Sequence, residues 1–78
     1  MGRIIFLRNI GVYVYEERGS PHHLPHAHVE RRGDRLASVF LLSLELFNQV
    51  ERLPSELVAK IKDEQVALLT EWVRLNGD

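Results

Sequence analysis

All four histidines of this 78-residue chain lie between positions 22 and 28. Histidine changes charge close to neutral pH, and its neutral ring is a common metal ligand. Prolines at positions 21 and 25 bracket the first histidine pair and restrict the residues that precede them. The segment Ser20–Glu30 is therefore predicted to be a stiffened loop that leads into a strand with chemically active side chains.

A divalent metal site is one prediction for this segment. His26 and His28 stand two residues apart, so on a strand they share a face, roughly 6–7 Å apart at the backbone. Imidazole nitrogens at about 2.0–2.1 Å suit zinc, and a third ligand could come from Glu30, His22 or His23. Such a set would leave a position for water, as catalytic zinc sites do.

Acid–base chemistry without a metal is a second prediction for the same histidines. One imidazole can accept a proton while its neighbour donates one, so His26 and His28 are candidate catalytic residues in a ribonuclease-like arrangement. Arginine suits phosphate, because its planar guanidinium binds two oxygens at once. The candidate binding residues are Tyr13, Tyr15, Arg18, His22, His23, Glu30 and Arg31, with Arg35 as a further arginine.

A structural role is the third interpretation. His26 and His28 could brace the loop through hydrogen bonds to backbone carbonyls or to a tyrosine hydroxyl. Tyr13 and Tyr15 are typical of core or interface packing, and Trp72, at helical spacing, is typical of a core. No Ser-His-Asp order, phosphate-binding glycine loop or RNA-recognition sheet signature is present.

The elements that would position these residues follow from periodicity. Alternating apolar and β-branched residues predict strands at about 4–7, 10–16, 26–32 and 36–46, with a glycine-containing hairpin turn at 32–34. Apolar residues three and four apart predict a helix over about 54–76, with a kink open near 62–64. The fold class is α+β: one domain, 1–78, with an antiparallel sheet of three to four strands and a C-terminal helix packed on one face.

Composition limits the class of protein. The formal net charge is −1 and there is no cysteine, so neither disulfides nor a thiolate zinc site contributes. No apolar run approaches the roughly 20 residues of a membrane span, and the N-terminal apolar run is too short for a signal peptide. These features predict a cytoplasmic protein without a membrane partner. No cofactor is indicated beyond the metal already considered.

A homodimer is predicted from residues 10–16 and 36–42, which carry apolar or aromatic side chains on both faces. A strand with two apolar faces belongs either at the centre of a domain or beneath a second subunit. The partner would be a second copy or a small protein.

The arrangement of motifs also resembles a known family. The residues that match the family's pattern are Gly11–Tyr15, Leu24–Val29, Gly33, Ala37, Leu53-Pro54, Leu69 and Trp72. Together they resemble the small bacterial proteins grouped as the domain of unknown function family numbered 4160, whose hallmark is Pro-His-x-His-Val after an aromatic strand. The resemblance covers about residues 4–76. The extra His22-His23 pair, and a segment before Trp72 about one helical turn shorter, depart from the pattern.

The resemblance implies little chemistry. Genes of that family often lie beside those of another small family, numbered 2442, in an arrangement like a toxin–antitoxin pair on mobile elements. It implies that His26 and His28 are the functional candidates. The leading hypothesis is therefore a toxin–antitoxin-like component that binds or acts on RNA or a partner protein through the His-rich site. The alternatives are a non-catalytic homodimeric module with structural histidines and a metal-binding protein, and whether the protein is an enzyme stays open.

Overall fold

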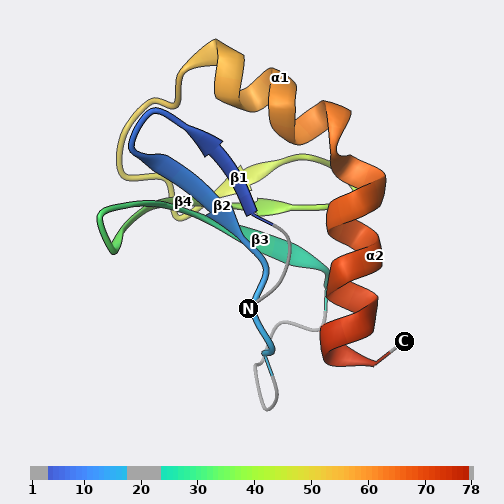
Figure 1. Cartoon of the computed structure of the whole chain (residues 1–78). Helices are drawn as coiled ribbons and strands as arrows, with labels where there is room; N and C mark the ends of the chain where they lie inside the picture. Colours follow the sequence, from blue (N-terminus) through green and yellow to red (C-terminus); the bar gives the residue numbers. More distant parts are fainter. Residues whose placement is uncertain (1–3, 18–23, 78) are drawn as a thin grey trace.

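Consecutive hairpins build the sheet. The computed structural model describes residues 4–17 and 24–77. Its strands are β1 (Ile4–Leu7), β2 (Ile10–Tyr13), β3 (His26–Arg31), β4 (Asp34–Phe40) and β5 (Leu46–Phe47). They form one antiparallel sheet in the order β1-β2-β3-β4-β5, and two helices follow, α1 (Ser55–Asp63) and α2 (Gln65–Asn76) (Figure 1). The α+β prediction is confirmed, with one strand more than expected.

Two of the expected strands are shorter than predicted. The strand expected at 10–16 ends at Tyr13, because the chain after it leaves the β3 ladder. The strand expected at 36–46 is interrupted by a turn, in which the Leu44 N–H donates to the Phe40 carbonyl at 2.7 Å. β5 then pairs back onto β4, with Phe47 opposite Ser38.

The predicted helix is two helices, because the chain bends at Glu64, where φ is −99° and ψ is 14°. Each helix buries its own pair of apolar residues, Leu57 and Ile61 in α1 and Leu68 and Trp72 in α2. α1 lies across one face of the sheet, whereas α2 runs past one end of it (Figure 1). The bend is what brings the last turns of α2 to the start of β3.

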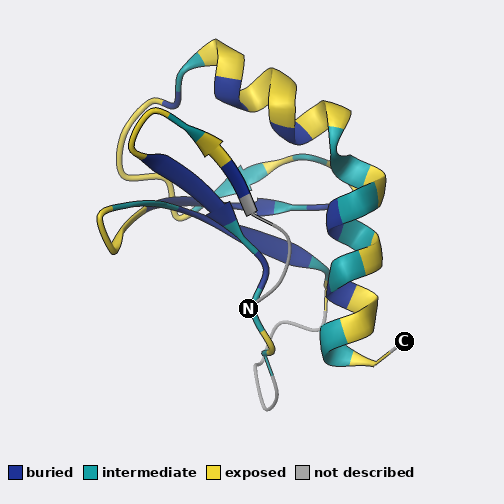
Figure 2. Ribbon diagram, viewed as in Figure 1, coloured by how far each residue is buried: buried dark blue, intermediate teal, exposed yellow. Residues whose placement is uncertain are grey.

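The core lies between the sheet and the two helices, with Leu57 and Ile61 from α1 and Leu68 and Trp72 from α2 (Figure 2). Every second residue of the central strands points into it, and Val12, Ala27, Val29 and Val39 are almost completely buried. None of the described helices is long and apolar enough to cross a membrane.

A β-bulge changes which residues face one another in the β3–β4 hairpin. Arg31 pairs with Asp34 and Glu30 with Arg35, but beyond the irregularity His28 pairs with Ser38. One residue of β4, Leu36, is therefore extra, and its carbonyl accepts from the Val50 N–H at 2.7 Å. Without the bulge, Ala37 would stand opposite His28.

Candidate metal centre

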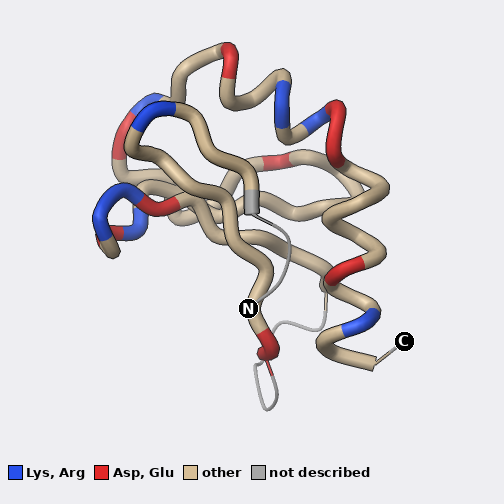
Figure 3. Tube along the Cα trace, in the orientation of Figure 1, with Lys and Arg blue, Asp and Glu red and all other residues tan. Residues whose placement is uncertain are grey.

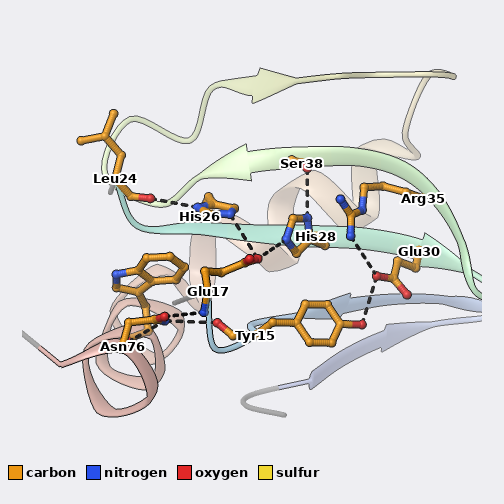
Figure 4. A network of polar contacts seen from close by, with 10 residues as sticks. Tyr15, Glu17, Leu24, His26, His28, Glu30, Arg35, Ser38 and Asn76 are labelled. Carbon is orange, nitrogen blue, oxygen red and sulfur yellow. Dashed lines mark hydrogen bonds and ion pairs between the residues drawn. The ribbon is translucent and has the colours of Figure 1, made fainter. Parts of the chain in front are cut away.

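β3 places His26 and His28 on the side of the sheet away from α1. The alternation of the strand puts both rings on one face, as the sequence predicts, and α1 lies behind the sheet in that view (Figure 4). The ring centroids are 5.1 Å apart. Both residues are buried, at 4% and 6% exposure. Two histidines this deep need partners for their nitrogens.

The third member of the cluster is Glu17, from the extended segment that follows β2. Its Oε1 lies 2.6 Å from His28 Nε2 and 3.4 Å from His26 Nε2. The three ligand-type atoms lie within 4.8 Å of one another. The Glu17 side chain is 24% exposed, so it forms the rim of the cluster while the two rings form its floor.

The other ring nitrogens are held from behind. His26 Nδ1–H donates to the Leu24 carbonyl at 2.9 Å, which leaves Nε2 as the ring nitrogen that faces Glu17. This is the backbone-carbonyl bond that the loop-bracing interpretation expects of a histidine. It is also the arrangement that orients a metal-ligating imidazole.

His28 Nδ1 lies 3.1 Å from the hydroxyl of Ser38. A hydroxyl can donate or accept, so Ser38 is compatible with both neutral tautomers of the ring. With Nε2–H bonded to the Glu17 carboxylate, Ser38 donates to Nδ1. With a metal on Nε2, Nδ1–H donates to Ser38 instead. The site can therefore exchange its internal hydrogen bond for a metal without leaving a buried atom unpaired.

Burial lowers the pKa of His28 below its usual value, because the charged ring loses hydration. The hydrogen bond that His28 donates to Glu17 opposes this shift, and the Arg35 charge adds to it. The net direction favours neutral imidazole, the form that binds a metal.

The donor set fits a zinc-class ion. Tetrahedral zinc with bonds of about 2.0–2.1 Å holds its ligand atoms about 3.3 Å apart. The separation of 3.4 Å between Glu17 Oε1 and His26 Nε2 already matches, and the 2.6 Å contact with His28 would need to open by less than about 1 Å. No two of the three atoms are more than 4.8 Å apart, so small side-chain movements would bring all of them to one ion. Two imidazoles with one carboxylate suit zinc and other transition metals more than magnesium or calcium.

The structure separates Tyr15 and Glu30 from the three ligand-type atoms of the cluster. The Tyr15 hydroxyl donates to Glu30 Oε2 at 3.0 Å, and Arg35 lies 3.9 Å from that oxygen. Glu30 is thus engaged by Tyr15 and Arg35, and the carboxylate that meets the histidines is that of Glu17. The Tyr15 ring lies 5.5 Å from that of His28, and Tyr13 stacks on Tyr15. The tyrosines are neighbours of the site rather than members.

Arg31 lies at the opposite end of β3, near the β3–β4 hairpin, where charged residues gather (Figure 3). It forms a two-point ion pair with Glu51, at 3.2 and 2.9 Å. Arg31 is therefore not brought to the histidines. Arg18, His22 and His23 lie outside the described residues.

Sequence reasoning missed two residues of this cluster. Glu17 reads as part of a polar turn, and no periodic signal links it to His28. Ser38 lies on a predicted strand, but the hairpin turn alone would place Ala37 opposite His28, so only the bulge reveals it.

No protein-family model, curated protein or solved structure matches this chain. The class that the fold and site define is a small α+β protein in which two buried histidines meet a partly exposed glutamate. The resemblance to the family numbered 4160 stays a prediction.

Proposed function

We propose that this chain is a metal-binding protein that holds one zinc-class divalent ion through Nε2 of His26, Nε2 of His28 and a carboxylate oxygen of Glu17. The observation that carries the proposal is the convergence of these three atoms within 4.8 Å of one another. Each imidazole is also oriented through its second nitrogen, by Leu24 or Ser38.

The proposal includes an open coordination position. Zinc binds four ligands in proteins, and the cluster found among residues 4–17 and 24–77 supplies three. A water or a small ligand would take the fourth place, on the side of the partly exposed Glu17. That arrangement is typical of zinc sites that react or exchange, rather than of closed structural ones.

Isothermal titration of the metal-free protein with zinc tests the proposal. We expect one equivalent to bind at pH 7.5, and His26→Ala and His28→Ala each to abolish it. Glu17→Gln should weaken binding at least tenfold, whereas Glu16→Gln, which alters the exposed neighbouring carboxylate, should bind as the unchanged protein does. Cobalt absorption would report tetrahedral geometry.

Absence of zinc binding contradicts the proposal. So does binding that survives in both histidine variants, which would move the site elsewhere in the chain.

A toxin–antitoxin-like role is the second proposal, and it rests on the family resemblance. The burial of His26 and His28 weighs against direct proton transfer to RNA, since a substrate must reach the atoms that act on it. It favours binding of a partner instead. Phe6, which is 63% exposed and makes an edge contact with Tyr13, supports the sheet face away from α1 as the binding surface.

Growth inhibition on expression tests this role. We expect inhibition that Phe6→Ser relieves and His28→Ala leaves largely intact. If His28→Ala relieved growth inhibition and Phe6→Ser did not, the histidines would act directly on the target.

For the proposed homodimer, light scattering at high micromolar concentration should give twice the chain mass, and a monomeric mass would exclude it.

A further inference from the structure

The last turn of α2 is attached to the candidate metal centre at two points. Trp72 packs its ring against His26, with centroids 4.8 Å apart, and Asn76 bonds to the segment that carries Glu17 (Figure 4). Trp72 lies 55 positions and Asn76 lies 59 positions after Glu17 in the sequence. The ligand-type atoms themselves belong to β3 and the segment after β2.

Asn76 uses its whole side-chain amide in this attachment. Its Oδ1 accepts from the Glu17 N–H at 2.6 Å, and its Nδ2 donates to the Tyr15 carbonyl at 3.1 Å. The same Nδ2 donates to the Trp72 carbonyl at 3.1 Å, which ties the amide to its own helix. A neighbouring strand would offer its backbone N–H and carbonyl to the same two groups.

The side chain of Asn76 therefore replaces a strand partner for the segment after β2. That segment leaves the sheet after Tyr13, and Asn76 holds Tyr15 and Glu17 extended beyond that point. A metal ligand binds more tightly when its backbone is already fixed, because only the entropy of its side chain is then lost on binding.

We infer that Asn76 is a positioning residue for the Glu17 ligand, and that the last turn of α2 controls metal affinity. The inference rests on the proposed metal site and adds its regulation. Coupling between two sites is reciprocal, so docking of the α2 end strengthens metal binding, and metal binding strengthens that docking to the same extent. Any ligand or modification that lifts this turn would weaken metal binding by the same factor.

Zinc titration of an Asn76 variant and a matched control tests the inference. Asn76→Ala should weaken zinc binding about tenfold, within the range seen when outer-shell partners of metal ligands are removed. The matched control is Gln65→Ala. Gln65 is also an α2 amide that holds distant backbone groups, the Leu41 carbonyl at 2.6 Å and the Leu42 carbonyl at 3.3 Å, and neither belongs to the metal centre. Its zinc affinity should stay within twofold of the unchanged protein.

A double-variant cycle separates positioning from general destabilisation. In the Glu17→Gln background, adding Asn76→Ala should cause no further loss, because the ligand it positions is already gone. Equal loss in both backgrounds, equal loss in Gln65→Ala, or zinc affinity of Asn76→Ala within twofold of the unchanged protein would each overturn the inference.

Two further results complete the test. If Asn76→Ala does not fold by circular dichroism, Asn76→Asp takes its place, since it keeps the acceptor for Glu17 and loses the donor to Tyr15. Absence of zinc binding in the unchanged protein overturns the proposed function and this inference together, whereas failure of the Asn76 test alone leaves the proposed function standing. Copper quenching of Trp72 fluorescence, lost in His26→Ala, would confirm that the ion sits beside α2.

Discussion

Successive residues of β3 face two different environments. Ala27 and Val29 point towards the α1 side and are completely buried among apolar side chains. His26 and His28, on the other side, are nearly as buried but meet a carboxylate, a hydroxyl and a backbone carbonyl.

The difference shows how the two faces divide the work. Apolar burial stabilises a fold through many interchangeable contacts, so no single partner is essential. Buried polar atoms cost free energy unless each has a partner, and no described buried side-chain atom lacks one. Stability is therefore spread over the α1 face, whereas the proposed metal binding depends on a few precise contacts on the other face.

The largest effect should come from the apolar face. Leu57 is completely buried in α1, so Leu57→Ala removes buried surface and leaves a cavity. We expect a loss of about 2–5 kcal/mol in the free energy of unfolding. Urea denaturation would measure it. Zinc affinity of the folded protein should not change, and a parallel loss of affinity would contradict the separation of the two faces.

A smaller effect on stability, but a direct one on the site, is expected of Ser38→Ala. Ser38 is buried and is the partner of His28 Nδ1, so its loss leaves a buried nitrogen unpaired. The cost should be about 1–3 kcal/mol. Zinc should also bind about tenfold more weakly. Ser43→Ala, which removes an exposed hydroxyl that accepts from the Glu45 N–H, is the control and should leave affinity unchanged.

Acid should lower the stability of the folded protein through His28, on the face of the sheet away from α1. The pKa of His28 is lowered in the folded state by burial, so the unfolded chain binds the proton more readily. Neutral His28 therefore contributes to the free energy of unfolding of the metal-free protein above about pH 6.5. That contribution should be lost as the pH falls from there through the lowered pKa. Thermal melts between pH 7.5 and 5 would follow it. His28→Gln should show a shallower decline, and identical slopes would refute the assignment.

The smallest effect should come from the charged hairpin end. The Arg31–Glu51 pair is about 35% and 43% exposed, and exposed ion pairs contribute at most about 1 kcal/mol. Arg31→Ala should stay below that value in chemical denaturation and leave zinc binding intact. A large effect of Arg31→Ala on zinc binding would contradict the conclusion that Arg31 lies apart from the metal centre.

Much of the fold could be predicted, because its signals are local. The strands at 4–7 and 26–31 and the helix start near residue 54 were located closely. The turn at Arg32-Gly33 was expected as well, and both residues have positive φ, which suits a two-residue hairpin. The ends of β2 and β4 were wrong, because strand ends depend on where the pairing partner stops.

The candidate site could be predicted only in part. The alternation of β3 correctly paired His26 with His28, but the carboxylate was expected from Glu30, which instead bonds to Tyr15. Glu17 reaches the rings from the segment after β2, where its backbone N–H donates to Asn76, 59 positions away in the sequence. No sequence pattern links these two positions.

The sequence by itself determined that two histidines share one side of a strand, because side chains alternate with a period of two wherever a strand forms. It also determined the hairpin that follows them. Only the tertiary structure decided their partners. The bulge at Leu36 exchanged Ala37 for Ser38, since a one-residue shift turns a strand's opposite face to its neighbour. The packing of α2 brought Asn76 to Glu17, a contact that depends on both helices and the whole sheet.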